Sequence, residues 1–170
     1  MRTYYWLLLA GLLAGTASCC SPPGEGSRAR TRDFGMEVQA HRAPNGHYLL
    51  TIYLTNRGTH RLSIDANCLP WRPYGMTLVL VAEDAYSSIL ERSHVIADST
   101  PNAMATIEPG QTMRGEVDLS EIYPELNAAV RKEEVSVFWS YGLIPALPAP
   151  NRRVGGWLCL PRAGAGKDRK

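Results

Sequence analysis

Hydrophobic and polar residues alternate in several short segments of the chain, a pattern typical of β-strands with one buried face. Residues 34–42 place an apolar side chain at every second position, and residues 47–56 repeat the pattern after a turn at Asn45-Gly46. Asn-Gly between two such segments indicates a β-hairpin. Strand character recurs later in the chain, in residues 62–64, 76–81, 88–96, 112–119, 135–141 and 153–160.

Helix signals are confined to one stretch of the sequence. Ser120 is a candidate cap for a helical turn that ends near Tyr123, and residues 124–132 suit a second short helix. About seven short strands with turn signals between them predict an all-β protein that folds as an antiparallel sandwich. We expect one domain over residues 34–161, because a chain of 170 residues allows one domain with a targeting segment and tails.

One part of this pattern resembles a known architecture. The run from Pro109-Gly110 to Tyr123, followed by the strand at residues 135–141, is similar to the C-terminal halves of small immunoglobulin-like modules in secreted bacterial proteins and protease prosegments. The resemblance implies an immunoglobulin-like β-sandwich. It implies nothing about activity, because sandwiches of this kind host many functions.

The first 19 residues have the organisation of an export signal. Arg2 gives a positive start, residues 4–14 are apolar, and residues 15–18 are small and precede Cys19. The apolar stretch is too short to cross a bilayer as a permanent helix. The sequence therefore predicts a signal peptide over residues 1–19 and export of the rest of the chain.

The end of this signal resembles the lipobox of bacterial lipoproteins, with Ala17 and Ser18 before Cys19. Thr16 departs from that pattern, because the family usually has leucine there. The family's cysteine is lipidated and becomes the first mature residue, so the resemblance implies a lipid anchor at Cys19. The lack of an aspartate after it implies the outer membrane. Residues 20–33 are then expected to form a flexible tether. The alternative is ordinary signal-peptide cleavage, which releases a soluble periplasmic or secreted protein.

Two cysteines, Cys68 and Cys159, lie within the expected domain. An exported domain folds in an oxidising compartment, where two thiols of one domain are expected to pair. We therefore predict a Cys68–Cys159 disulfide that cross-links the sandwich. In the chain-entropy description a bond that closes so long a loop stabilises a fold by about 4–5 kcal/mol.

The charge of the chain is unevenly distributed and argues against nucleic-acid binding. Arg2 contributes +1, residues 21–33 contribute +1 and residues 162–170 contribute +3, so the formal net charge of +2 leaves −3 for residues 34–161. A nucleic-acid-binding domain is expected to have a basic face on the domain itself. We interpret residues 162–170 as a disordered basic tail.

Three aromatic residues lie close to these cysteines in the sequence. Trp71 and Tyr74 follow Cys68, while Trp157 shares one side of the last predicted strand with Cys159. Either they pack over the disulfide as core, or they form an exposed patch of the kind enriched in binding hot spots. Trp71, Tyr74 and Trp157 are accordingly the candidate partner-binding residues.

The remaining polar residues do not form a recognisable catalytic or metal-binding motif. The four histidines (His41, His47, His60, His94) occur without an HExxH or CxxC motif, so we predict no metal site and no cofactor. No Gly-x-Ser-x-Gly motif is present. Adjacent carboxylates such as Glu83-Asp84 point to opposite sides of a strand. We therefore predict no catalytic residues.

These features favour a membrane-anchored periplasmic lipoprotein that acts as a non-catalytic protein-binding module. Its partner is expected to be a protein of the periplasm or envelope. The chain itself is expected to be an inhibitor or immunity-type protein, or an accessory subunit of an envelope assembly. The alternative is a small secreted hydrolase or a carbohydrate-binding domain. An enzyme is expected to have a polar cleft with shifted pKa values, whereas a binding module is expected to expose an apolar patch.

Overall fold

The computed structural model describes residues 27–72, 78–93, 103–143 and 152–163 of the chain. Strands dominate these ranges, and the helices are short. The elements in chain order are β1 (Ser27–Arg30), β2 (Phe34–Arg42), β3 (Tyr48–Asn56), β4 (Leu62–Asp65), the 3₁₀ helix η1 (Ala66–Cys68), β5 (Leu78–Asp84), β6 (Met104–Ile107), β7 (Thr112–Asp118), α1 (Leu119–Ile122), α2 (Leu126–Lys132), β8 (Val135–Leu143) and β9 (Arg152–Leu160).

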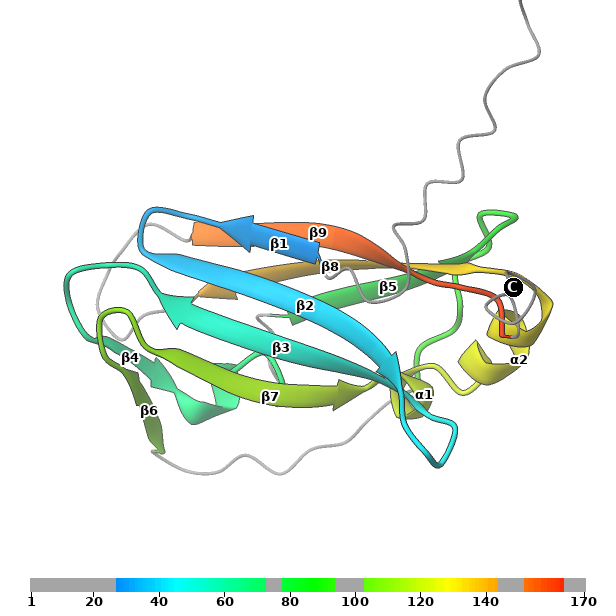
Figure 1. The fold of residues 1–170 in the computed structure, drawn as a ribbon, viewed down its shortest axis with the longest axis horizontal. Helices are drawn as coiled ribbons and strands as arrows, with labels where there is room; N and C mark the ends of the chain where they lie inside the picture. The colour runs from blue at the N-terminus through cyan, green and yellow to red at the C-terminus, as the bar shows by residue number, and fades with distance from the viewer. Residues whose placement is uncertain (1–26, 73–77, 94–102, 144–151, 164–170) are drawn as a thin grey trace, which may run out of the picture.

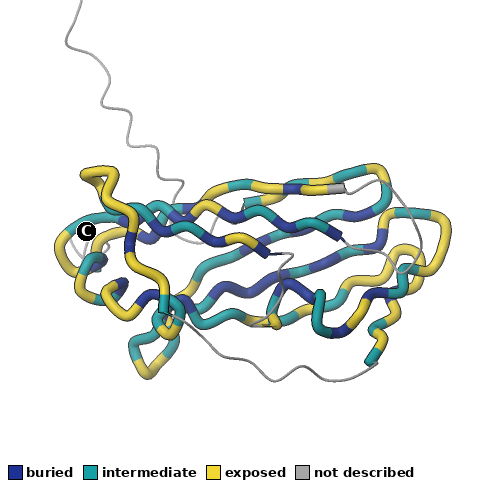
Figure 2. Tube along the Cα trace, turned by 180° about the vertical axis from the view of Figure 1, so that it is seen from behind, coloured by how far each residue is buried: buried dark blue, intermediate teal, exposed yellow. Residues whose placement is uncertain are grey.

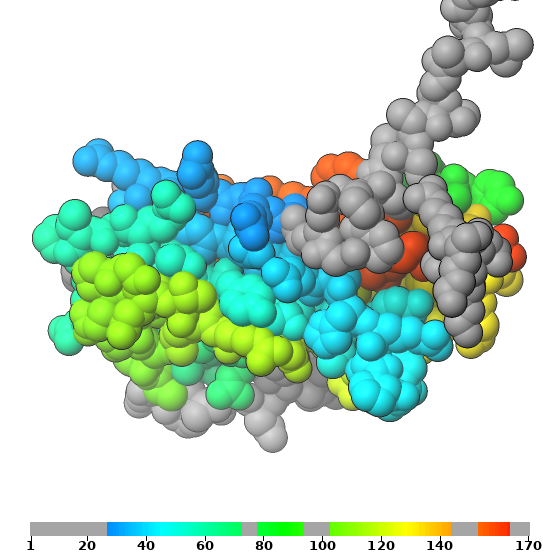
Figure 3. Space-filling model, viewed as in Figure 1, coloured from blue at the N-terminus to red at the C-terminus, as the bar shows by residue number. Residues whose placement is uncertain are grey.

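Two antiparallel sheets form the body of the protein. One has the strand order β1-β2-β3-β7 and the other has the order β5-β8-β9, while β4 and β6 make a small separate pair. The two larger sheets lie one over the other, with α1 and α2 at one end (Figure 1). The outer surface of the larger sheet covers one side of the molecule (Figure 3). The predicted all-β, antiparallel and sandwich-like character is confirmed.

The core lies between these two sheets and follows from the alternation in the sequence. Phe34, Met36 and Val38 of β2 are buried at every second position, and so are Val137 and Trp139 of β8. Buried and less buried positions alternate along the strands in Figure 2. One contact spans the sheets directly, because the ring of Phe34 meets the ring of Tyr141 edge-on with centroids 6.1 Å apart.

The β2–β3 hairpin forms where its turn signal predicts one. Phe34 pairs with Asn56 at one end and Arg42 pairs with Tyr48 at the other. Gly46 closes the turn with a φ of 88°, a conformation that glycine adopts without steric cost.

Asn56, the last residue of β3, is fully buried, and its side chain contacts two other segments of the chain. Its amide nitrogen donates to the carbonyl oxygens of His60 and Ile107, each at 2.8 Å, and its amide oxygen accepts from the backbone N–H of Gly58 at 2.9 Å. A buried polar side chain is tolerated when its hydrogen bonds are made. This residue therefore joins the end of β3 to β6 and to the loop between β3 and β4.

The start of the domain differs from the sequence prediction. Residues 27–30 were expected within a flexible tether over residues 20–33, but they form β1 and pair with residues 35–38 of β2. Alternation over only four residues is too short to identify a strand from sequence. The strand β6 was also missed for this reason, while the expected strand at residues 88–96 is reduced in its described part to one bridge between Ile89 and Glu83.

The two helices lie where the sequence places them, but the cap of α1 is a different residue. Asp118, not Ser120, precedes α1, and its Oδ1 accepts from the backbone N–H groups of Ser120 and Glu121 at 2.8 and 3.2 Å. A carboxylate at this position satisfies backbone donors that a helix start leaves without partners. The hydroxyl of Ser120 accepts instead from the backbone N–H of Tyr48 at 3.0 Å, which holds α1 against β3.

The predicted Cys68–Cys159 disulfide is not formed, which corrects the sequence analysis. Cys68 is a thiol in η1 packed against the core, and Tyr141 donates to its carbonyl oxygen at 3.1 Å. Tyr141 pairs with Val154 of β9, and Cys159 lies five residues further along that strand, about 16 Å away at the usual rise per residue. Since a disulfide requires Cα atoms within about 7 Å, these two cysteines do not meet.

Candidate functional site

The candidate site is the outer face of the three-stranded sheet, where apolar side chains project away from the core. In β8, Val137 and Trp139 point inward and are buried, so the residue between them, Phe138, points outward. In β9, Leu158 is buried and its neighbour Trp157 is exposed for the same reason.

These outward residues are direct neighbours across the strands. Val81 of β5 pairs with Phe138 of β8, and Phe138 pairs with Trp157 of β9. The exposed fractions are 41% for Phe138, 42% for Trp157 and 44% for Val79, which lies next to Val81 on the same side of β5. We call Val79, Val81, Phe138 and Trp157 the aromatic face.

Small and polar residues surround the aromatic face. Ser136 and Ser140 flank Phe138 on its own strand, and Gly155 pairs with Ser140. Arg153 donates to the hydroxyl of Ser140 at 3.0 Å, which places a positive charge at the margin. An apolar centre with a polar margin is the usual organisation of a protein–protein interface.

Of the three predicted partner-binding residues, one belongs to this face. Trp157 is there, but Trp71 is not, and Tyr74 lies outside the described residues. Trp71 is half-buried and packs against the core. Its indole covers Gly115, an inward position of β7, so closely that a Cβ at Gly115 would collide with the ring. Trp71 and Trp157 are therefore not neighbours, since Trp71 lies over β7 and Trp157 lies on β9 beside Phe138.

Trp71 instead forms one wall of a cavity of about 330 Å³ between β5, β7 and α1. Asp118 lines this cavity but already has partners at both oxygens, since it caps α1 through Oδ1 and meets Nδ1 of His47 through Oδ2 at 2.7 Å. Glu116, also in the lining, forms an ion pair with Arg114. Asp118 thus makes structural contacts and Glu116 belongs to a solvent-exposed ion pair, and neither set of contacts identifies a general acid or base.

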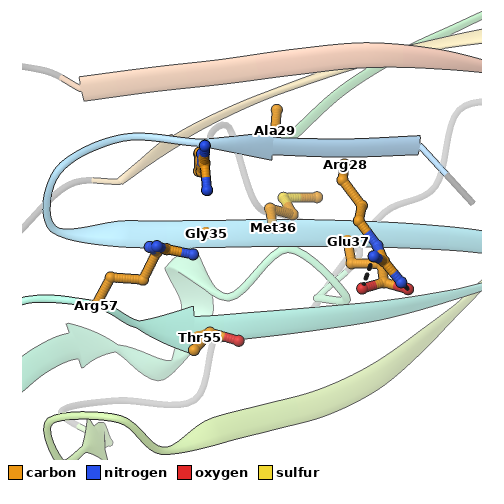
Figure 4. A pocket seen from close by; sticks show the side chains of 8 residues that line it. Arg28, Ala29, Gly35, Met36, Glu37, Thr55 and Arg57 are labelled. Carbon is orange, nitrogen blue, oxygen red and sulfur yellow. Dashed lines mark hydrogen bonds and ion pairs between the residues drawn. The ribbon is translucent and has the colours of Figure 1, made fainter.

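A second depression, of about 450 Å³, lies over β1 and β2 and is lined by basic side chains (Figure 4). Arg28 is bonded to Glu37, with 2.8 Å between Nε and Oε2, and this hydrogen bond is the main reason that the pKa of Glu37 lies below its usual value. Arg57 extends towards Gly35, where a Cβ would lie 3.2 Å from its Cδ. The arginines here are exposed to solvent, which is typical of surface charge.

The histidines and cysteines do not come together in the described structure. His41 lies 3.4 Å from the hydroxyl of Thr51 and His47 lies beside Asp118, while His94 is outside the described residues. Among the residues that the structure describes, no three His, Cys, Asp or Glu side chains form a group suited to a metal ion.

The predicted lipidation site, Cys19, is also outside the described residues. No helix in the described ranges is long and apolar enough to cross a membrane. No protein-family model matches the chain, and no curated protein matches it either.

Sequence reasoning missed Phe138, although a signal was present. Residues 135–141 read as alternating, with Val135, Val137, Trp139 and Tyr141 on one side; the other side holds two serines and one phenylalanine. An aromatic residue on the polar side of an amphipathic strand indicates an exposed apolar position. That position becomes a site only through its pairing with Trp157, which the sequence does not specify.

Proposed function

We propose that the protein is an exported, non-catalytic lipoprotein that binds a protein partner of the cell envelope on its aromatic face. The lipid is attached at Cys19, and the domain faces the periplasm from the outer membrane. Partner binding then requires no chemistry from the domain, only a surface that becomes buried on association.

The observation that supports this proposal is the pairing of exposed Phe138 and Trp157 on the outer face of the β5-β8-β9 sheet. Large aromatic side chains lose little conformational entropy on binding and contribute much buried area, so they are enriched at interface hot spots. Adjacent valines extend the apolar surface, and contiguous exposed apolar patches on soluble domains mark interaction sites.

We further propose an immunoglobulin-like arrangement of the sandwich. In chain order and in adjacency, β2-β3-β7 and β5-β8-β9 correspond to strands A-B-E and C-F-G of that fold. This support comes from topology alone and does not extend to function.

The two alternatives would require other features of the aromatic face or of the cavity beside Trp71. A carbohydrate-binding domain also uses exposed aromatics together with polar side chains that bind sugar hydroxyls; here Phe138 pairs with Val81 and Trp157, and the serines and Arg153 lie at the margin. A hydrolase would need a carboxylate or nucleophile available for chemistry, whereas Asp118 in the cavity beside Trp71 is engaged at both oxygens. The proposed function has two forms, an inhibitor or immunity-type protein and an accessory subunit of an envelope assembly. Identification of the partner would distinguish between them.

The anchor is tested by fractionation. Cys19→Ala in the full chain is expected to move the protein from the membrane to the soluble periplasmic fraction, while Cys68→Ala leaves it on the membrane. If Cys19→Ala stays with the membrane, the lipid anchor at this residue is rejected.

The binding face is tested by affinity for the partner recovered from crosslinked cells. Trp157→Ala and Phe138→Ala are each expected to weaken binding by about 2 kcal/mol, or roughly 30-fold in Kd, if they act as hot-spot residues. Tyr86→Ala is the matched control, because Tyr86 is 83% exposed and lies outside the aromatic face. Equal affinity in all three variants would contradict the proposal, as would binding to envelope polysaccharide that depends on Trp157.

A further inference from the structure

The depression over β1 and β2 contains two guanidinium groups that no described carboxylate pairs with. Arg28, at one side of the depression, is bonded to Glu37. Arg30 and Arg57 also line it, and among the residues that the structure describes no carboxylate lies within salt-bridge distance of either one. Asp33, in the turn between β1 and β2, is not part of the lining. We call this depression the arginine pocket.

Arg30 and Arg57 flank a strand position that has no side chain. Arg30 pairs with Gly35 across β1 and β2, and Gly35 pairs with Thr55 across β2 and β3. The residues on either side of Gly35 in β2 are buried, so position 35 faces outward. A Cβ at Gly35 would lie 3.2 Å from Cδ of Arg57 and 3.9 Å from Cβ of Arg30. The glycine therefore leaves an open floor between the two arginine side chains (Figure 4).

We propose that the arginine pocket binds a phosphomonoester group between Arg30 and Arg57. A guanidinium presents its N–H donors in a planar fork that matches the oxygens of a phosphate. A phosphomonoester on a side chain carries a charge of about −1.5 to −2 at pH 7, which two guanidinium groups neutralise. A carboxylate or a phosphodiester carries a single negative charge and would leave one of the two groups uncompensated.

Thr55 supplies a third polar group to the arginine pocket. Its hydroxyl oxygen lies 2.8 Å from the hydroxyl oxygen of Thr112, and either of the two can be the donor. When Thr112 donates, the hydroxyl hydrogen of Thr55 is available to an oxygen of the phosphate. The pocket then combines two charged donors with one neutral donor.

The size of the arginine pocket indicates a ligand larger than a free phosphate ion. Its volume is about 450 Å³, within the range of sites that hold small organic molecules. A phosphate held by the arginines would leave room for the organic part of an ester. Two sources carry this chemistry, namely a soluble phosphate ester and a lipid whose headgroup ends in a phosphomonoester. The inference goes beyond the proposed function, because it involves β1, β2 and β3 and neither the aromatic face nor the lipid anchor.

Amide chemical shifts of the mature protein in micelles of a neutral detergent test the site, at neutral pH and constant ionic strength. The probes are glycerol 3-phosphate in solution and phosphatidic acid within the micelles. At least one of them is expected to shift the signals of Gly35 and Thr55 saturably, and acetate is expected not to. A response to glycerol 3-phosphate alone assigns the site to soluble esters, and a response to phosphatidic acid assigns it to lipid headgroups as well; both outcomes support the proposal. No saturable shift with either probe, or an equal response to acetate, would overturn it.

Charge variants separate a specific site from general surface charge. Arg30→Gln and Arg57→Gln each remove a charge-assisted hydrogen-bond donor and are expected to weaken binding of the responding probe roughly tenfold. Arg61→Gln is the matched control, because Arg61 is also exposed but does not line the pocket. The control is expected to bind as the parent protein does. Equal weakening by all three variants would mean that the probe responds only to net charge, which would contradict the proposal.

Gly35→Val tests the shape of the arginine pocket without a change of charge. Gly35 is not among the described glycines with positive φ, and valine is favoured in strands, so the backbone accommodates the new side chain. The valine is expected to fill the floor between the arginines and to abolish binding. Undiminished binding in a Gly35→Val protein that unfolds at the urea concentration of the parent would overturn the site. If this variant does not fold, the exposed arginine variants decide the question, since they do not disturb the core.

Discussion

Phe138 and Trp157 occupy directly paired positions on β8 and β9, and both side chains project from the outer face of the β5-β8-β9 sheet. The residues that precede and follow Phe138 on β8 are buried. Side chains on a strand alternate between the two sides of the sheet. One set of residues in β8 therefore packs in the core, and the other set is exposed and available for binding.

This separation predicts that substitutions at neighbouring positions destabilise the domain to very different extents. Trp157→Ala and Phe138→Ala are each expected to lower the free energy of unfolding by less than about 1 kcal/mol, the usual contribution of an exposed cross-strand pair. Trp139→Ala, one position along β8 but 3% exposed, is expected to cost about 3–5 kcal/mol because it opens a cavity. Urea unfolding of the three variants measures this. A cost above 2 kcal/mol at Trp157 would show that it belongs to the core.

Asn56→Ala is expected to lower the free energy of unfolding by about 2–3 kcal/mol. The change removes the donor of the buried hydrogen bond to the Ile107 carbonyl and of the part-buried hydrogen bond to the His60 carbonyl. Asn127→Ala on α2 is the control, since alanine favours a helix and little change is expected there. If Asn56→Ala unfolds at the same urea concentration as the parent, the buried amide does not join these loops.

Gly115→Val is expected to destabilise the domain by about 1–3 kcal/mol, because the new side chain occupies the space of the Trp71 indole. The double variant Gly115→Val/Trp71→Ala is expected to cost less than the sum of the single changes, since removal of the ring relieves the collision. Strict additivity in thermal or urea unfolding would contradict the contact.

Alkaline pH is expected to destabilise the domain through Tyr141 and Cys68. The pKa of Tyr141 is raised first by burial and then by the nearby Cys68, and the pKa of Cys68 is raised by burial and Asp65. The folded state therefore keeps protons that the unfolded state loses above its ordinary values of 9.0 for the thiol and 10.0 for the phenol. Stability is present below those values and falls as pH rises through them, by up to about 1.4 kcal/mol per pH unit for each group.

The measurement is urea unfolding from pH 8 to pH 11, compared between the parent protein and Tyr141→Phe. The variant is expected to lose about 1 kcal/mol at pH 8, because the Cys68 carbonyl loses its donor. Its stability is expected to decline less steeply above pH 10. A parallel decline in both proteins would mean that Tyr141 does not contribute to the alkaline transition.

Much of the fold was accessible from the sequence because it depends on local alternation. The β2–β3 hairpin, β7, β8, β9 and the two helices lie where the periodicity and turn signals place them. β1 and β6 were not found, since four residues give too little alternation and their pairing depends on distant strands. The cap of α1 was misassigned by two residues because Asp118 and Ser120 are both good capping residues.

The candidate site was only partly accessible from the sequence, for a different reason. The sequence places Trp157 and Cys159 on one side of the last strand, but it does not specify whether that side faces the core. Pairing Cys159 with Cys68 required both sulfurs to reach the space between the two sheets. Outward placement of β9 residues 157 and 159 directs Cys159 away from the core against which Cys68 packs, and it makes Phe138, not Trp71, the neighbour of Trp157.

Site-specific photocrosslinking in cells tests the central claim most directly. A photoreactive amino acid replaces Trp157 in the full-length, membrane-anchored protein, and the same replacement at Tyr86 serves as the control. The account predicts one discrete adduct with a membrane-associated protein at position 157, which Phe138→Ala weakens strongly and which position 86 does not form. Adducts of equal yield at both positions, or none at position 157 in a stable and correctly localised protein, would contradict it.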